Sequence, residues 1–216
     1  YAGCLLAMDK ELSKRLFRDA GIPTPEWVWY DTADGNPDDL IAQIGLPCVV
    51  KPNDCGSSVG VSIVSDRAAL EAALSEAAKW GRRVLVEKKI VGRELTVGVL
   101  DGRALPPVEI IPKSGFYDYR NKYQGTTLEI CPAEIPAGIT SFVSSLSLRA
   151  FEVLRLDGYA RFDFILDANG TPWCLEANAL PGMTPTSLLP QEAAAVGISY
   201  PDLCERILLL SMRKKR

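Results

Sequence analysis

Four polar side chains in the C-terminal part of the sequence could bind a cation together. Asp163, Glu176 and Asn178 offer carboxylate and amide oxygens, and Arg161 offers a guanidinium group. Oxygen ligands of this kind suit Mg²⁺ or Mn²⁺, which proteins commonly hold through one or two carboxylates while phosphates supply further ligands. The residue types therefore indicate a divalent-cation site, provided that the chain brings these side chains to one place.

A β-hairpin over 159–178 is expected to bring them together. Asn169-Gly170 predicts a two-residue loop, because both loop positions of a type I′ turn need positive φ. Pairing outward from that loop predicts these opposed residues: Ala168 with Thr171, Asp163 with Glu176, and Arg161 with Asn178. Side chains alternate along a strand, so the other face is expected to be apolar and to hold Phe162, Phe164 and Leu166 opposite Ala177, Leu175 and Trp173.

Two directly opposed carboxylates repel each other unless positive charge lies between them, because their Cβ atoms would be about 4.5 to 5.5 Å apart. A hard cation between Asp163 and Glu176 removes that repulsion. The alternative is that Arg161 neutralises both acids in a surface network. The hairpin by itself leaves both interpretations open.

A second candidate site is the loop Gly56–Gly60, which the pattern places between two strands, with Lys51 at the end of the first strand. Small residues let backbone N–H groups approach an anion, and the hydroxyls of Ser57 and Ser58 add donors. A polar turn without a ligand is the alternative. The loop also fits the G-x-S-x-G motif of serine hydrolases, but that motif joins a strand to a helix and needs a histidine base, whereas a strand follows here.

Composition narrows the chemistry further. The 216 residues include no histidine, which excludes Ser-His and Cys-His nucleophile systems, histidine bases and histidine-bound zinc. A net charge of −3 argues against nucleic acid or an anionic membrane as a partner, and the longest charge-free run, 177–191, is broken by prolines and too short to span a bilayer. The six cysteines form no C-x-x-C pair, so we expect free, mostly buried thiols in a reducing cytoplasm and no metal cluster.

The elements that must position these residues follow from apolar periodicity and turn residues. Helices are expected over 8–20, 37–45, 66–81 and 140–155, with two short helices near the C-terminal end. Strands are expected over 26–31, 46–52, 61–65 and 82–90, and within 93–111. The predicted buried face of the first helix holds Leu12, Leu16, Phe17 and Ala20. Strands and helices mix without strict alternation, which predicts an α+β fold with lobes at 1–90 and 91–216.

Lys51 with the glycine-serine loop, the strand that reaches Glu87 and the hairpin follow one another in the order typical of ATP-grasp enzymes. Six segments extend this resemblance to D-alanine–D-alanine ligases: MDKELSKRL (8–16), VVKPNDCGSSVGVS (49–62), VLVEKKIVGRELTVGVL (84–100), FYDYRNKY (116–123), ARFDF (160–164) and LEANALPGMTPTSLLP (175–190). The resemblance covers nearly the whole chain. It implies an ATP-grasp fold of two α+β lobes, with ATP bound in the cleft between them.

The resemblance implies a nucleotide site at this cleft. The lysines expected to contact the ATP phosphates are Lys10 and Lys51, and Ser57 and Ser58 correspond to the flexible loop that closes over them. Adenine and ribose are expected to contact Glu87, the backbone of Lys88 and Ile90, and Glu94. Lys122, which also contacts ATP in this scheme, and Tyr123 correspond to a mobile lid. A closed lid excludes the water that would hydrolyse an acyl phosphate.

The resemblance also implies metal and substrate roles. Asp163, Glu176 and Asn178 correspond to ligands of two Mg²⁺ or Mn²⁺ ions, with Glu176 bridging both. Arg161 corresponds to the residue that stabilises the acyl-phosphate transition state. The substrate is expected to contact Arg161, Asn178, Gly182, Ser187 and Leu188. The catalytic set is expected to comprise Arg161, Ser57, Lys122, Tyr123 and Gly182.

The activity implied by the resemblance is ATP-dependent ligation of two D-alanines in the cytoplasm, for peptidoglycan precursor synthesis. ATP phosphorylates the carboxylate of the first D-alanine, and the amine of the second attacks the acyl phosphate. The full-length enzyme is expected to be a homodimer without nucleic-acid or membrane partners. The alternatives are a D-alanine–D-serine ligase, another ATP-grasp carboxylate–amine ligase, and a noncatalytic nucleotide-binding module.

Members of the family carry a further domain of about 100 residues before this region. That domain supplies an acidic residue for the ammonium of the first D-alanine and the residues that select the second substrate. Because the sequence begins at Tyr1, we expect the ATP-grasp portion of a longer enzyme. This portion should bind nucleotide but be weak or inactive as a ligase by itself.

Overall fold

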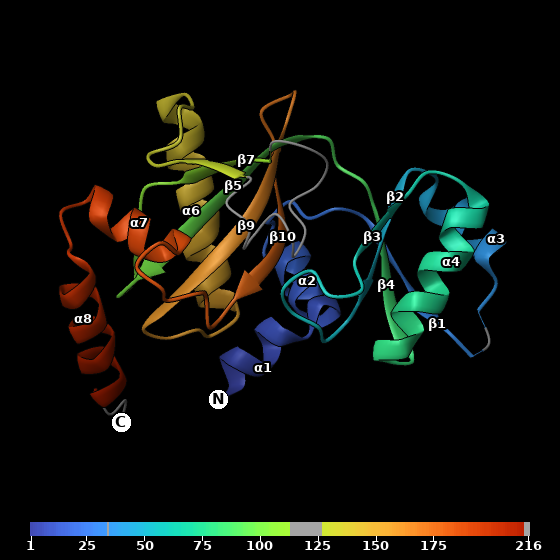
Figure 1. Ribbon diagram of the computed structural model, residues 1–216, viewed down its shortest axis with the longest axis horizontal. Coiled ribbons are helices and arrows are strands. Elements are labelled where there is room, and N and C mark those ends of the chain that lie inside the picture. The colour runs from blue at the N-terminus through green and yellow to red at the C-terminus, as the bar shows by residue number, and fades with distance from the viewer. Residues whose placement is uncertain (34, 113–126, 214–216) are drawn as a thin grey trace.

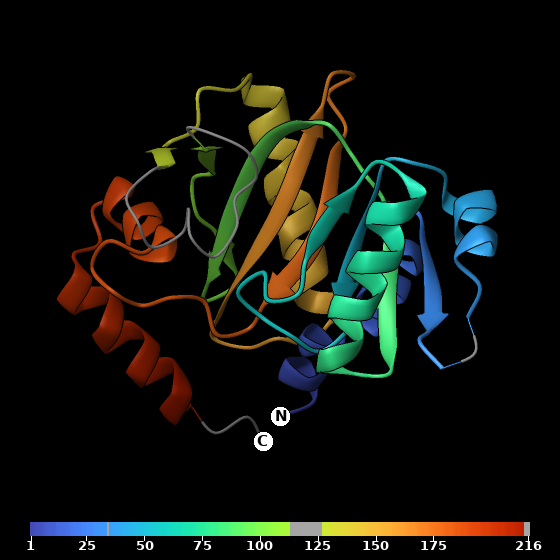
Figure 2. The same cartoon turned by 45° about the vertical axis from the view of Figure 1, so that its right-hand side comes forward.

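The computed structural model describes residues 1–33, 35–112 and 127–213. They form two halves, each built on its own sheet (Figures 1 and 2). The strand pairs of these residues are antiparallel, which confirms the predicted α+β class. The expected lid residues Lys122 and Tyr123 lie outside the described residues.

The first half is a four-stranded sheet in the order β1-β4-β2-β3. Its strands are β1 (Trp27–Asp31), β2 (Cys48–Pro52), β3 (Ser62–Val64) and β4 (Arg83–Lys88). Helices α3 (Pro37–Ile44) and α4 (Arg67–Ala77) pack against it, and the 3-10 helix η1 (Ala78–Trp80) follows α4 (Figure 1). Side-chain caps determine where the helices begin: Asn36 accepts from Asp38 N at 3.0 Å, and Asp66 accepts from Ala69 N at 2.8 Å.

The second half is a six-stranded sheet in the order β10-β9-β5-β7-β8, with β6 paired to β5. Its strands are β5 (Gly92–Leu100), β6 (Arg103–Ala104), β7 (Val108–Pro112), β8 (Thr127–Ile130), β9 (Tyr159–Asp167) and β10 (Pro172–Asn178). Its helices are α6 (Ala137–Val153), α7 (Leu188–Ala195) and α8 (Tyr200–Met212). Along β5, Val97 and Val99 pack with α6, whereas Gly98 and Leu100 face α7 and α8, so helices cover both faces of this strand.

Two helices that precede the first sheet in the sequence pack on the second sheet. Helices α1 (Ala2–Met8) and α2 (Lys10–Asp19) contribute Ala7 and Phe17 to the core cluster that contains Phe162. Figure 1 shows α2 where the two halves meet. The chain passes from one sheet to the other between β4 and β5, close to the predicted boundary at 90/91. That division into lobes stays a prediction.

Most of the fully buried residues of α2 are polar, and the predicted face is wrong at Leu12 but confirmed at Phe17, with Leu16 and Ala20 packed against the same core cluster. Leu12 is exposed, and Leu16 and Ala20 are only half-buried. The buried residues of α2 are Lys10, Glu11, Ser13, Lys14 and Phe17. The helix predicted over 8–20 corresponds to α2, while Met8 is the last residue of α1, because Asp9 ends α1 and caps α2 by accepting a hydrogen bond from Leu12 N at 3.0 Å.

Other differences concern element ends and the thiols. The helix predicted over 66–81 is α4 followed by η1, α6 begins at Ala137, and the region 93–111 contains β5, β6 and most of β7.

All six cysteines are free, as predicted. However, only Cys48 and Cys174 are buried, so the expectation of mostly buried thiols is wrong. None of the helices in the described ranges is long and apolar enough to cross a membrane.

The hairpin of β9 and β10 has a three-residue loop, Ala168–Gly170, so the predicted two-residue loop is wrong. Asp167 N donates to Thr171 O at 3.0 Å, and of the two predicted loop residues only Gly170 has positive φ, at 81°. The Asp167 side chain explains this geometry, because Oδ1 accepts from both Asn169 N and Thr171 N at 2.9 Å. Such a loop places its last residue in the left-handed region, which favours glycine.

The longer loop shifts the register near the turn, and a bulge corrects it further along. Leu166 pairs with Pro172 and Phe164 with Cys174, so the predicted pairs with Trp173 and Leu175 are wrong. The register then shifts between Cys174 and Glu176, which leaves Leu175 outside the pairing. Beyond this bulge the predicted pairs are confirmed: Asp163 with Glu176, Phe162 with Ala177, and Arg161 with Asn178.

Glu192 of α7 completes the hydrogen bonding of β5 where that strand changes partner. β5 pairs with β7 as far as Thr96 and with β6 from Val99, so Gly98 falls between the two pairings. Glu192 Oε1 accepts from Gly98 N at 2.8 Å, and Oε2 has no hydrogen-bond partner. Burial raises the pKa of Glu192 well above its ordinary value of 4.5; Gly98 N–H and Arg161 oppose this shift, and Asp163 adds to it.

Glu192→Gln should remove a pH dependence of stability. The unfolded chain ionises Glu192 above a pH of about 4.5 while the folded chain keeps it protonated, so wild-type stability falls as pH rises from that value toward the raised pKa. The amide carries no such proton. Urea denaturation from about pH 4 to about pH 7 should therefore show a stability difference in favour of the variant that grows with pH. Glu205→Gln, at an exposed position, is the control and should follow the wild type. If the free energy of unfolding of Glu192→Gln had the same pH dependence as that of the wild type, an uncharged Glu192 would be contradicted.

Phe164→Ala should destabilise the second sheet, because the side chain is fully buried in its core. Removal of the ring is expected to cost about 3 to 5 kcal/mol. Leu128→Ala, at a position that is 53% exposed on β8, should stay within about 0.5 kcal/mol of wild type. Denaturant unfolding followed by circular dichroism measures both variants.

Candidate nucleotide and metal site

A cavity of about 720 Å³ lies between the two sheets, in the size range typical of small-molecule sites. Strands β2, β3 and β4 line one side, and β5, β7, β9 and β10 line the other. The apolar lining is formed by Val49, Val61, Ile63, Ile90, Val91, Ile110, Ile111, Pro112, Ile165 and Leu175. The residues expected to contact nucleotide that line this cavity are Lys51, Glu87, Lys88, Ile90 and Glu94.

A buried cluster of two lysines and one acid lies at the wall of this cavity. Lys51, near the end of β2, pairs with Glu87 Oε1 from β4. Lys14 of α2 lies 3.0 Å from Glu87 Oε2, an ion pair outside hydrogen-bond geometry. Lys14 also donates to Thr24 Oγ1 at 2.6 Å, and its ammonium lies 5.2 Å from the centre of the Trp27 ring. Both carboxylate oxygens of Glu87 therefore face an ammonium group.

Burial and the ion pairs shift the pKa values of this cluster in opposite directions. Burial raises the pKa of Glu87, but Lys14 and Lys51 outweigh it, so the pKa lies below its ordinary value. Burial lowers the pKa of Lys14, and Lys51 lowers it further, while the ion pair with Glu87 opposes the shift. The cluster thus favours an ionised Glu87 held between two cations.

Lys10 connects the loop after β2 with the hairpin. Its Nζ donates to Asn53 O at 3.3 Å and to Cys55 O, and it lies 4.0 Å from Glu176 Oε2. Burial lowers the pKa of Lys10, Lys51 lowers it further, and Glu176 opposes the shift. Lys10 therefore lies between the candidate phosphate loop and the candidate metal ligand Glu176, and its contact with ATP phosphates stays a prediction.

The loop with Ser57 and Ser58 lies between β2 and β3, as predicted. Both serines have left-handed backbone, with φ of 53° and 57°. Such a conformation costs of order 1–3 kcal/mol per non-glycine residue and occurs preferentially at functional sites. Gly60 also has positive φ, and a β-carbon there would lie 2.7 Å from Pro52. Val59 N donates to Gly56 O at 3.1 Å, so Ser57 and Ser58 are the central residues of a tight turn, and phosphate binding by this loop stays a prediction.

Asp163 is the centre of the candidate metal site. Arg161 donates to both of its oxygens at 2.9 Å, Thr96 Oγ1 donates to Oδ1 at 2.7 Å, and Asn178 Nδ2 donates to Oδ2 at 2.9 Å. Arg161 therefore pairs with Asp163, whereas Glu176 has its ion pair with Lys10, so the alternative in which Arg161 neutralises both acids in a surface network is met only at Asp163. Burial lowers the pKa of Arg161, but Asp163 more than offsets this, so Arg161 stays charged.

The donors in this place fit a hard divalent cation. Asp163 and Glu176 are paired across β9 and β10, and Asn178 follows on the same side of β10. Within the described ranges, no group of three or more acidic or thiol side chains surrounds a metal position. Mg²⁺ is commonly held through one or two carboxylates while substrate phosphates supply further ligands, so this donor set matches its usual protein contribution.

The expected substrate residues lie in the segment that enters α7. Ser187 accepts from Thr184 N at 3.1 Å and lies 2.8 Å from Thr184 Oγ1. A β-carbon at Gly182 would lie 3.0 Å from Ser187 Oγ, so these two expected residues are close neighbours. Leu188 is buried, and its side chain packs in a small cluster with Val108.

Among the residues that the structure describes, the sequence interpretation missed four buried charged residues: Glu11, Lys14, Glu109 and Glu192. The sequence interpretation assigns Lys14 no role, and its one signal is its place four residues after Lys10, one helical turn away. Glu192 is the single acid in the helical segment LLPQEAAA, and an acid in so apolar a segment is the signal that could have identified it. Its carboxylate bonds Gly98, the partner of Arg161 across β5 and β9.

Comparison with known proteins identifies similar sequences over most of the chain. Residues 16–209 match the family model described as "D-ala D-ala ligase C-terminus". The D-alanine–D-alanine ligase of Synechococcus sp. (strain JA-3-3Ab) is 45% identical over 206 residues, covering 94% of this chain and 64% of the relative. That of Methylacidiphilum infernorum (isolate V4) is 46% identical over 206 residues, covering 95% and 66%. The chain spans just under two thirds of the length of these relatives.

Solved structures of D-alanine–D-alanine ligases also match this chain. The D-alanine–D-alanine ligase from Bacillus anthracis matches with a TM-score of 0.88 at 40% identity, covering 98% of this chain and 69% of that one. A structure of the B. anthracis enzyme complexed with ATP gives a TM-score of 0.87 at 35% identity, covering 98% and 68%. The predicted ATP-grasp fold is confirmed, and the chain belongs to the D-alanine–D-alanine ligase family.

Proposed function

We propose that this chain binds ATP in the cavity between the two sheets and forms the ATP-grasp portion of a D-alanine–D-alanine ligase. The observation that carries the proposal is the position of the cavity: it has an apolar lining and runs past Lys51, and the carboxylates of Asp163 and Glu176 lie on the same two strands, β9 and β10, that line one side of it. An apolar cavity suits a purine base, and the charged groups suit a metal-bound polyphosphate.

The proposed nucleotide contacts follow the lining of the cavity. The base would lie against Ile63 and Ile110, with the backbone of Lys88 and Ile90 at its polar edge. Glu94 would accept from the ribose hydroxyls. The phosphates are proposed to contact these residues: Lys51, Lys10, Ser57 and Ser58. Glu87 would face the base from its place between the two lysines.

Asp163, Glu176 and Asn178 would hold one or two Mg²⁺ or Mn²⁺ ions. When bound, such ions neutralise phosphate charge and orient the γ-phosphate. Arg161 lies beside Asp163, where its permanent charge would stabilise the acyl phosphate. Lys10 would add a second cation beside Glu176.

In the proposed reaction, the carboxylate of the first D-alanine attacks the γ-phosphorus of ATP, and the bond to the β-bridging oxygen breaks to release ADP. The amine of the second D-alanine then attacks the acyl carbon. Inorganic phosphate leaves as the amide bond forms, and the amine loses a proton. Gly182, Ser187 and Leu188 would bind the substrate carboxylate and the developing oxyanion, and Lys122 and Tyr123 would form the lid. Positioning and charge neutralisation suffice, so no side-chain nucleophile is needed.

For the whole protein we propose a cytoplasmic homodimer that supplies a peptidoglycan precursor. The free state of all six cysteines supports a reducing compartment. The net charge of −3 gives no field that favours nucleic acid or an anionic membrane as a partner.

Calorimetric titration with Mg²⁺ and ATP tests the nucleotide proposal directly, and saturable binding by the folded chain is expected. ADP formation by the full-length protein should depend on D-alanine. A preference for D-serine as second substrate would indicate a D-alanine–D-serine ligase. Binding without ADP formation for D-alanine, D-serine and D-lactate would indicate a noncatalytic module. A folded chain that binds no ATP would reject the proposed site.

Glu176→Gln should weaken Mg²⁺-dependent catalysis by roughly hundredfold, because the amide removes the negative charge that holds the ion. The full-length protein is assayed for D-alanine-dependent ADP formation across a range of Mg²⁺ concentrations. Glu205→Gln, at an exposed position of α8, is the matched control and should behave as wild type. Unchanged turnover in the Glu176 variant, with the fold intact by circular dichroism, would rule out the proposed ligand set.

A further inference from the structure

Lys14 differs from the other lysines of the candidate site because it lies behind the cavity wall. Lys51 and Glu87 line the cavity, whereas Lys14 is fully buried and contacts the far oxygen of Glu87. Thr24 and the Trp27 ring hold the Lys14 ammonium in place. An entering ligand can therefore reach Lys51 and Glu87 but meets Lys14 only through Glu87.

Nucleotide binding at this site would bring phosphate oxygens to Lys51, where they compete with its present partner. In the structure Lys51 is paired with Glu87, which is 2% exposed. A phosphate group that takes Lys51 would leave Glu87 with one ammonium fewer. A buried carboxylate without a partner is strongly unfavourable, so the exchange needs a second cation that stays in place. Lys14 meets this requirement, because its contacts do not involve the cavity.

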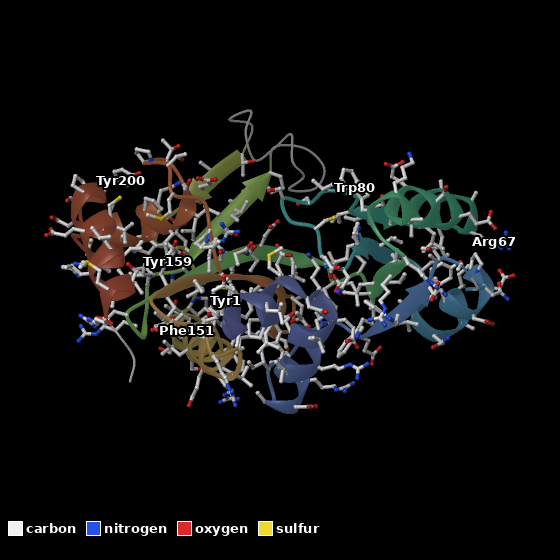
Figure 3. All side chains as sticks on the ribbon, turned by 90° about the horizontal axis from the view of Figure 1, so that it is seen from below. Tyr1, Arg67, Trp80, Phe151, Tyr159 and Tyr200 are labelled. Atoms are coloured by element: carbon white, nitrogen blue, oxygen red, sulfur yellow. The ribbon has the colours of Figure 1, made fainter. Side chains whose placement is uncertain are left out.

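The pair also connects the two halves of the molecule. Lys14 belongs to α2, which packs on the second sheet, and Glu87 belongs to β4 of the first sheet. Figure 3 shows the whole molecule with its side chains from below, with α2 between the halves. Binding of phosphate to Lys51 would therefore leave this bridge between the halves intact.

We propose that Lys14 is a positioning residue for nucleotide binding: it is the permanent counter-ion of Glu87 and thereby frees Lys51 to exchange a carboxylate for phosphate. The inference rests on the proposed nucleotide site. It predicts that Lys14 matters for ligands that carry phosphate and not for ligands that lack it. A purely structural Lys14 would affect both kinds of ligand alike.

The test compares ATP with adenosine on the wild-type chain and on Lys14→Met. The dissociation constant for ATP should rise by about tenfold or more, because Lys51 becomes the only partner of Glu87, whereas that for adenosine should change by less than about twofold. Titration calorimetry measures the first constant, and chemical-shift titration measures the second if it is weak. Lys79→Met is the matched control, since Lys79 is exposed and pairs with Glu76 on the surface; it should leave both constants unchanged.

A double-mutant cycle with Glu87→Gln identifies the route of the effect. An amide at position 87 does not hold Lys51, so Lys14→Met should cost far less ATP affinity in the Glu87→Gln background than in wild type. An equal cost in both backgrounds would overturn the proposal. Lys14→Gln, which keeps a polar group near Thr24, serves if the Met variant does not fold.

The outcomes separate this inference from the proposed function. A wild-type chain that binds neither ATP nor adenosine refutes the nucleotide site itself. A wild-type chain that binds both, with Lys14 variants that lose both by the same factor or lose neither, refutes only the counter-ion role. Selective loss of ATP binding supports both.

Discussion

The buried carboxylate of Glu87 is the constraint on which the two halves of this molecule depend. It lies in β4 of the first sheet, and its cations come from β2 of the same sheet and from α2, which packs on the second. A buried charge is tolerated only with good partners, so Glu87, Lys14 and Lys51 must be brought together when the chain folds. The burial of Lys14 on α2 follows from this requirement, and Lys10, one turn earlier on the same helix, lies between Asn53 and Glu176.

The cavity wall and the candidate metal ligand Asp163 lie on the same side of β9. β9 carries Asp163 and Ile165 on the same side, and the cavity wall continues from Ile165 toward the charged end. The chain has no histidine, and the proposed function needs none, because carboxylates, lysines and Arg161 would be enough to position and neutralise phosphate groups. Glu192 supports this region from the other side by bonding Gly98 beside Arg161.

Sequence patterns predicted the α+β class and the strands on either side of the candidate phosphate loop, because these follow from local alternation and turn residues. The predicted pairs Asp163–Glu176 and Arg161–Asn178 are confirmed for another reason: the bulge after Cys174 cancels the extra residue of the hairpin loop, and the sequence rule foresaw neither. The patterns failed where tertiary packing decides. Leu12 is exposed while Lys14 is buried, because the partner of Lys14 lies 73 positions away in the sequence, at Glu87. The loop prediction failed because the Asp167 side chain binds two backbone N–H groups, which the Asn-Gly rule does not take into account.

The bulge in β10 determines how abruptly the surface changes from apolar to charged. A regular strand presents every second residue to one side, so neighbouring residues face opposite ways. At the bulge, Leu175 lines the cavity while Glu176 pairs with Asp163 on that same side. The consecutive residues Leu175 and Glu176 therefore form adjoining parts of one surface, the first apolar and the second anionic. The border between a region for a flat apolar ring and a region for charged groups is only one residue wide.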